Sequence, residues 1–158
     1  MADLPELRRL LADSPHLSRV ARWQHEQWGR LYPETSFRAW QEELRGICGT
    51  RGVPSVFLAL EEGRPVGTAS LVEDDMEVRR ELTPWLASVF VLPEWRGKGV
   101  ASHLVRRVEH EARQAGIERL YLFTPDRQAL YRRLGWETHE ALVYRGEEVT
   151  IMTRRLVT

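Results

Sequence analysis

The hydrophobic pattern of the N-terminal third predicts two amphipathic helices. Ser14 followed by Pro15 is typical of an N-cap and a first helical residue, so the first helix is expected to run from there to about Gly29. The segment 34–36 can open the second helix. Apolar residues recur every three or four positions, with Leu17, Val20, Ala21, Gln24 and Trp28 near one face of the first helix and Phe37, Trp40, Leu44 and Ile47 in the second. Residues 5–12 fit either an edge strand or a short helix.

Beyond residue 54 the hydrophobic period changes to that of strands. The runs 55–60 and 66–72 flank a turn and are expected to form a hairpin. The run Trp85–Leu92 is apolar on both faces, which is typical of a central strand, and Pro93 stops it. A strand is expected at 119–124, and two antiparallel strands at about 136–144 and 148–156 close the chain.

The clearest helix is expected over residues 99–115, where Ala101, Leu104, Val105, Val108, Ala112 and Ala115 make one apolar stripe. A shorter helix is expected from Pro125 and Asp126 to just before Gly135. The long helix lies between two strands, and such a crossover joins parallel strands. The sequence therefore predicts an α/β (α+β) fold with a mixed, mostly antiparallel sheet, helices on both faces and one β-α-β crossover.

The length of 158 residues fits one domain, 1–158, without a linker or repeat. The formal net charge of +0 excludes a global field that attracts nucleic acid or an anionic membrane, and neither partner is expected. Cys48 is the only cysteine, so no disulfide and no metal site are expected. No apolar run approaches the ~20 residues of a membrane span, and residues 1–5 lack the pattern of a signal peptide, so a cytoplasmic protein is expected.

Candidate chemistry lies in the segment Val89–Ala101, where an apolar strand runs into a glycine-bearing loop that opens the long helix. The first amides of a helix have no internal partner and carry partial positive charge. Gly97 and Gly99 let a bulky anion approach this backbone, so the segment suits a pyrophosphate. A plain turn before a helix is the alternative. Two other phosphate motifs fail, because no nucleoside-triphosphate loop is present and Ser102 stands where a dinucleotide fingerprint needs a small third glycine or alanine.

The motif Arg96-x-x-Gly99-x-Ala101, after an apolar strand and before a helix, resembles the acyl-CoA signature of the GNAT superfamily of N-acetyltransferases. About thirty residues on, the segment 129–136 contains Leu-Tyr before Leu-Gly-Trp, which is similar to a second landmark of that superfamily. The resemblance covers residues 55–156. It implies acceptor-side helices at about 14–52, an acyl-CoA core at about 85–136 and a C-terminal hairpin at 136–156.

The resemblance implies that acetyl-CoA is the cosubstrate and an amine the acceptor. The coenzyme would contact Phe90, Val91, Arg96, Gly97, Lys98, Gly99, Val100 and Ala101: the strand would bind the pantetheine arm, and the loop and helix start the pyrophosphate. Tyr131 would be the general acid that protonates the leaving thiolate. An ordinary core tyrosine is the alternative for Tyr131.

The general base is left open, because the strand segment Trp85–Val89 lacks the carboxylate that many family members carry there. The alternatives are Glu73, Asp74, Asp75, His25, Glu26 or a chain of water molecules. The candidates for the acceptor side are Trp28, Tyr32, Asp74 and Trp85, where aromatic rings could pack an apolar acceptor or hold a cation, with core packing as the alternative.

Three functional alternatives therefore stay open: an acetyltransferase of small amines, an acetyltransferase of a peptide or protein amine, and a non-catalytic CoA-binding module of the same fold. A monomer or a homodimer is compatible with each of them.

Overall fold

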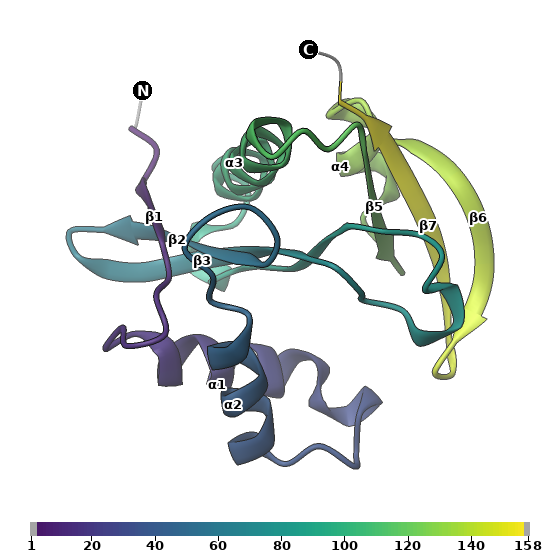
Figure 1. Cartoon of the computed structure of the whole chain (residues 1–158). Helices are drawn as coiled ribbons and strands as arrows, with labels where there is room; N and C mark the ends of the chain where they lie inside the picture. The colour runs from purple at the N-terminus through teal and green to yellow at the C-terminus, as the bar shows by residue number, and fades with distance from the viewer. Residues whose placement is uncertain (1–2, 157–158) are drawn as a thin grey trace.

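Seven strands form one sheet in the order β1-β2-β3-β4-β5-β7-β6, as the computed structural model of residues 3–156 shows (Figure 1). The strands are β1 (Glu6–Arg9), β2 (Ser55–Glu61), β3 (Arg64–Val72), β4 (Trp85–Val91), β5 (Arg119–Thr124), β6 (Glu137–Tyr144) and β7 (Glu147–Arg155). All neighbouring strands are antiparallel except β4 and β5, which are parallel. The predicted mixed sheet is confirmed; residues 1–2 and 157–158 of the predicted domain lie outside the described residues.

Helices cover both faces of the sheet (Figure 1). They are α1 (Leu17–Trp28), α2 (Phe37–Gly46), α3 (Val100–Gln114) and α4 (Gln128–Arg133), with short 3₁₀ turns η1 (Gly29–Leu31), η2 (Glu77–Arg79) and η3 (Pro93–Trp95). Helix α3 is the crossover between β4 and β5, and it lies with α4 on one face, whereas α1 and α2 lie on the other. The predicted crossover helix is therefore confirmed to within a residue at each end.

Two predicted helix starts were wrong. Helix α1 begins at Leu17, because the Ser14 hydroxyl accepts a hydrogen bond from the amide of His16 at 3.1 Å and the Ser14 carbonyl accepts one from Leu17 at 3.2 Å, which makes a separate turn. Helix α4 begins at Gln128 and not at Pro125, since the Thr124 hydroxyl holds the intervening residues in a bend. By contrast, Ser36 caps α2 as expected and accepts a hydrogen bond from the amide of Ala39 at 3.1 Å.

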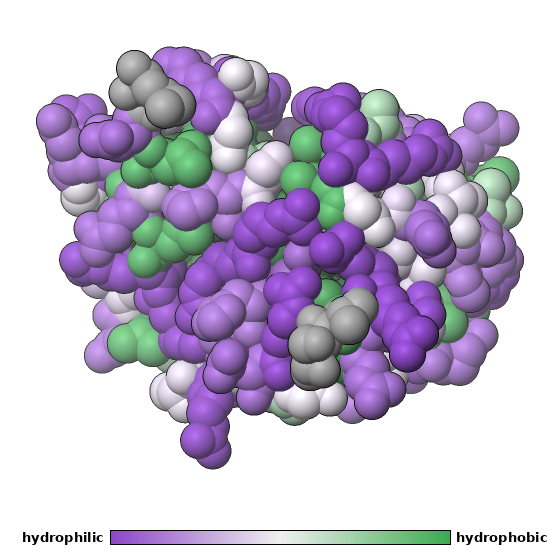
Figure 2. Space-filling view, turned by 90° about the horizontal axis from the view of Figure 1, so that it is seen from above, coloured by the Kyte–Doolittle hydropathy of each residue, from purple (hydrophilic) through white to green (hydrophobic). Residues whose placement is uncertain are grey.

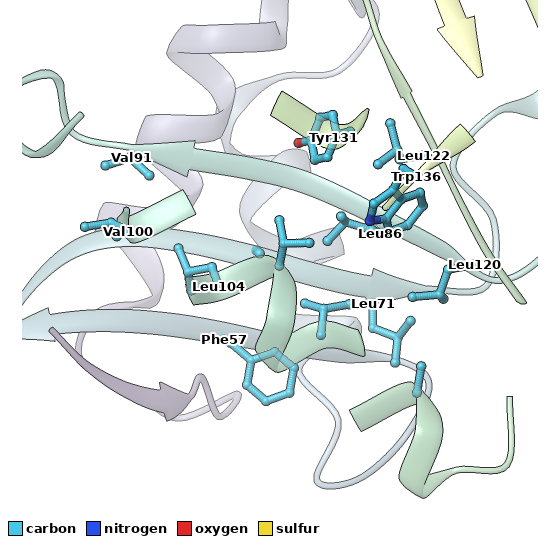
Figure 3. Close-up of a cluster of buried hydrophobic side chains, with 14 of the residues drawn as sticks. Phe57, Leu71, Leu86, Val91, Val100, Leu104, Leu120, Leu122, Tyr131 and Trp136 are labelled. Atoms are coloured by element: carbon cyan, nitrogen blue, oxygen red, sulfur yellow. The ribbon is translucent and has the colours of Figure 1, made fainter. Parts of the chain in front are cut away.

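The main core lies between α3 and the sheet and holds the helix start in place (Figure 3). Its fully buried side chains include Phe57, Leu71, Leu104 and Leu120. Each contributes about 1.5–3 kcal/mol relative to exposure. Four residues of the predicted α3 stripe, Leu104, Val105, Val108 and Ala112, are buried in this core, and Ala101 is partly buried against it. Ala115 is exposed after the end of α3, so that residue of the stripe was wrong.

The outer face on the α3 side is mainly hydrophilic, with apolar residues in separate patches (Figure 2). Within residues 3–156, no helix combines the length and the apolar character needed to cross a membrane.

Candidate active site

Strands β4 and β5 separate after a single residue pair, Trp85 with Tyr121. The cause is a bulge in β4: Ser70 of β3 pairs with Ala87 and Thr68 pairs with Phe90, so two residues of β4 oppose one of β3. Ser88, the first residue of the bulge, has a φ of 54°, which a serine adopts only under local strain. The bulge turns the end of β4 away from β5 and opens a gap in the middle of the sheet.

The N-terminus of α3, which we call its mouth, borders the same gap and is preceded by two glycines in the left-handed region. Gly97 has a φ of 75° and Gly99 a φ of 85°, values that favour glycine over any residue with a side chain. A Cβ atom at Gly97 would meet no other atom within 4 Å, so the space beside the loop is open. The amides of the first turn of α3 therefore face accessible space without an intrahelical partner.

A cleft of about 980 Å³ runs from this mouth through the gap and onward to the α1–α2 side of the molecule. Among the predicted coenzyme-binding residues, those that line it are Phe90, Val91, Arg96, Gly97, Gly99, Val100 and Ala101. Lys98 does not line it; its ammonium group lies 5.0 Å from the centre of the Trp95 ring. The Arg96 side chain donates a hydrogen bond from Nε to the Val91 carbonyl at 2.9 Å and so lies along the β4 edge of the cleft.

Tyr131 lies in the wall of the cleft opposite β4, and only 6% of its surface is exposed. The Trp136 ring packs edge-on against it with centroids 6.1 Å apart, and the Trp136 amide donates to the Tyr131 carbonyl at 2.9 Å. Figure 3 shows its hydroxyl on the side away from Trp136. Burial raises the pKa of this phenol to about 12, so Tyr131 keeps its proton at neutral pH.

At the other end of the cleft, three of the four predicted acceptor-side residues are present: Trp28, Tyr32 and Asp74. Trp85 was wrong as an acceptor-side residue. Its side chain is fully buried against Tyr121 and Phe123, and its indole donates a hydrogen bond to the Leu82 carbonyl at 2.7 Å. A strand that is buried on both faces shows the same apolar pattern whichever residues turn toward the cleft, which explains the error.

The candidates for a general base differ in whether their side chains line the cleft. Asp74 and Asp75 line the cleft, whereas Glu73 lines only a smaller neighbouring hollow. His25 lies outside both and packs its ring against Phe37 and Trp40. Burial raises the pKa of Asp75 from 3.8 to about 8, which brings this carboxyl into the range where it can take a proton near neutral pH.

Sequence reasoning missed a set of residues that the C-terminal hairpin brings to the cleft. Arg145, at the β6–β7 turn, forms ion pairs with Glu34 at 3.1 Å and Glu77 at 2.8 Å, and its guanidinium lies 4.1 Å from the centre of the Tyr32 ring. Tyr144 lines the cleft beside it. No local signal could have found these contacts, since a turn of the type Arg-Gly-Glu carries no information about which distant loop it meets.

Comparison with known proteins agrees with this arrangement. Residues 17–136 match the model of the acetyltransferase (GNAT) family. The chain is 29% identical over 143 residues, covering 84% of this chain and 82% of the relative, to the uncharacterised N-acetyltransferase YjgM of Escherichia coli K12. Two solved structures have the same fold. An aminoglycoside 6′-acetyltransferase type Ii superposes with a TM-score of 0.75 at 16% identity, over 97% of this chain and 98% of that one. An aminoglycoside 6′-N-acetyltransferase in complex with coenzyme A gives 0.74 at 14% identity, with the same coverage.

The fold, the split between β4 and β5 and these matches define an acyl-CoA-dependent acetyltransferase. The chain belongs to the acetyltransferase (GNAT) family.

Proposed function

We propose that this enzyme transfers the acetyl group of acetyl-CoA to an amine by direct attack on the thioester, with Tyr131 as the general acid. The observation that carries the proposal is the continuous cleft, which connects the amides at the mouth of α3 with the Tyr131 side chain and then with the α1–α2 side. A single cleft with two ends suits a reaction in which two substrates meet in its middle.

On the coenzyme side, the pyrophosphate would bind the amides from Gly97 to Ala101, where the helix start favours negative charge. The pantetheine arm would follow the free edge of β4. The main chain of Phe90 pairs with Thr68 of β3, on the same side as the Leu92 amide that donates to the Val66 carbonyl. The main chain of Val91 faces the cleft, where its carbonyl accepts the hydrogen bond from Arg96, so the Val91 amide is the stronger of the two predicted main-chain partners for this arm. The opposite wall, formed by β5 and α4, contains Tyr131, whose hydroxyl would then lie near the thioester sulfur.

The chemical step needs one base and one acid. The acceptor nitrogen, once it has lost a proton, attacks the thioester carbonyl and forms the C–N bond. The C–S bond then breaks, and the departing thiolate takes the phenolic proton of Tyr131. The nitrogen of the new amide loses its remaining extra proton to solvent, from which Tyr131 regains a proton. The raised pKa of Tyr131 keeps the phenol protonated at neutral pH, so that its proton is available when the thiolate leaves.

A non-catalytic CoA-binding module is a second candidate, because β4 carries no carboxylate between Trp85 and Val91. Release of free thiol from acetyl-CoA in the presence of a panel of small amines and of amine-bearing peptides separates the two. An acetyltransferase releases thiol only with an amine present. Calorimetric binding of CoA without thiol release from any acceptor would favour the binding module.

Tyr131→Phe tests the role of the phenol. We expect turnover to fall by about ten-fold to a thousand-fold with CoA affinity nearly kept, since the variant removes only the acidic proton. Tyr121→Phe is the matched control, because Tyr121 is also on the β5 side but packs against Trp85 outside the cleft. Unchanged turnover of Tyr131→Phe across the pH range would remove Tyr131 from the mechanism.

A further inference from the structure

Asp75 lies where the acceptor end of the main cleft meets the second hollow, which has about 340 Å³ and is bounded by α2. Ala87 and Ser88, where the β4 bulge begins, line both spaces beside it. The loop that carries Asp75 follows β3 directly, and β3 is hydrogen-bonded to β4. Asp75 is therefore anchored close to the point at which β4 and β5 separate.

The carboxylate of Asp75 differs from the other acidic groups at this end of the cleft. Glu77 is paired with Arg145, and Glu147 is paired with Arg30 at 3.4 Å. Asp74 is exposed. Asp75 is partly buried, and among residues 3–156 it has no hydrogen bond and no ion pair; burial alone shifts its pKa. A carboxylate that is partly shielded from water and has no partner costs free energy, so a ligand that supplies a cation relieves this cost.

Aromatic side chains surround this position. Tyr32, Trp40, Trp28 and Tyr144 line the same end of the cleft. Burial and then Tyr144 raise the pKa of the Tyr32 phenol most, and Asp75 raises it further, which places Asp75 near this ring. Rings of this kind bind the apolar body of a ligand and add cation–π attraction for a positive group.

Contacts between distant segments close this end. Arg145 joins the β6–β7 turn to the segment before α2 through Glu34 and to the 73–84 loop through Glu77, and it also donates a hydrogen bond to the Leu31 carbonyl at 3.0 Å. Arg79 and Glu140 form a second link, at 2.6 Å, between that loop and β6. Three segments are thus tied together around Asp75 and bound this end of the cleft, which suits a small molecule better than an extended chain.

We propose that Asp75 binds the ammonium group of the acceptor and takes one of its protons, and that the acceptor is a small primary amine with an apolar or aromatic body. The proposal rests on the proposed acetyl transfer. The proton moves from the ammonium nitrogen to the Asp75 carboxylate, which leaves a neutral amine whose lone pair attacks the thioester.

The charge state of Asp75 governs the strength of this site. Below the carboxyl pKa of about 8 the free protein holds a proton there, so an ammonium ion has to displace it; above that pH the carboxylate is ready to bind. Ionisable groups line the same region from each neighbouring element: Glu43 of α2, Tyr32 after η1, Glu73, Asp74, Glu77 and Arg80 of the loop, and Tyr144 and Arg145 of the hairpin. Among the acidic groups, Glu77 is paired with Arg145, and Glu43, Glu73 and Asp74 are exposed, so Asp75 is the partly buried carboxyl that an arriving cation would meet.

Calorimetric titration of the CoA-saturated protein with benzylamine tests the site without any turnover. We expect benzylamine to bind the wild-type protein, more tightly at pH 8.5 than at pH 6.5. In Asp75→Asn we expect the affinity to fall by at least about ten-fold at pH 8.5 and to lose this pH dependence, because a hydrogen bond to a charged group is removed. Benzyl alcohol, which has the same ring without the charge, should be unaffected by the substitution.

Glu81→Gln is the matched control variant, since Glu81 lies on the same loop but is exposed and outside the cleft. Equal benzylamine affinity in wild type and Asp75→Asn would overturn the proposal. So would binding of a lysine-containing peptide in preference to benzylamine and short alkylamines. If benzylamine binds in an Asp75-dependent way but no thiol is released from acetyl-CoA, the binding site stands and the proposed acetyl transfer fails.

Discussion

Two carboxyl groups, one fully buried and one partly buried, have opposite surroundings in this protein. Glu109, on α3, is completely buried, and it accepts a hydrogen bond from the Trp136 indole at 3.0 Å. It also forms ion pairs with Arg106 at 2.9 Å, Arg154 at 3.3 Å and Arg113 at 3.8 Å. Asp75, beside the β4 bulge, has no such partner among the described residues.

The difference separates a structural role from a binding role. Around Glu109 the protein supplies positive charge in excess, and the network joins α3 to β7 and to the turn after Tyr131. It holds Trp136, which in turn packs against Tyr131. Around Asp75 the protein supplies rings and open space instead. An anion whose partners are all internal stabilises the fold, whereas one whose partner is missing is available to a ligand.

Glu109→Ala should produce the largest effect on stability. It leaves three arginines and the Trp136 indole without their shared acceptor, so we expect the free energy of unfolding in urea to fall by about 3–5 kcal/mol. Glu109→Gln keeps an acceptor for the indole and should cost less, about 1–3 kcal/mol. A loss below about 1 kcal/mol in the alanine variant would mean that the network is not structural and that the comparison with Asp75 fails.

Asp75→Asn should raise the free energy of unfolding, whereas Glu109→Ala lowers it. The pKa of this carboxyl is raised from 3.8 to about 8 in the folded protein, so its contribution to stability is full below about pH 4 and is lost as pH rises to about 8. The asparagine has no such dependence. We therefore expect the variant to gain stability relative to wild type between pH 4 and pH 8, by on the order of 2 kcal/mol at the upper end, because water entering the cleft reduces the full value.

Thermal unfolding of both proteins across this pH range measures the gain, and taking the difference cancels the titration of carboxylates elsewhere, such as Glu140, whose pKa is lowered by Arg79. A variant that is less stable than wild type at pH 8 would show that Asp75 has an internal partner in solution.

The coenzyme half of the molecule could be predicted from the sequence because its signals are local. An apolar strand, two glycines and the stripe of α3 follow one another within 89–115, and Tyr131 lies five residues before Trp136. Each of these features is set by neighbours along the chain, so the spacing predicts the elements, and the resemblance to the GNAT superfamily implies the roles of their residues. The φ of Ser88 is the exception: the bulge that opens the cleft lies inside a run that looks like a regular strand.

For the acceptor half of the cleft, the sequence predicts which segments contribute but not which of their residues. Asp75 was one of several acidic candidates in the loop after β3, and nothing in the sequence distinguishes it from Asp74, because burial and the lack of a partner arise from tertiary packing. The contact of Arg145 with Glu34 and Glu77 joins residues 111 and 68 positions apart. Such long-range pairs leave no trace in hydrophobic periodicity.

Arg145→Met should have the smallest effect, and it tests whether the acceptor end of the cleft is independent of the coenzyme end. Methionine keeps an apolar contact with the Tyr32 ring but removes the ion pairs to Glu34 and Glu77, which are partly exposed and together contribute about 1 kcal/mol or less to stability. We expect the KM for the amine to rise about two-fold to ten-fold with the KM for acetyl-CoA unchanged, because only the acceptor end loosens. Arg8→Met, which breaks an exposed pair with Glu6 on β1, should change neither value. An equal rise in both KM values for Arg145→Met would mean that the hairpin supports the whole cleft, and the division of the cleft into two independent ends would then be wrong.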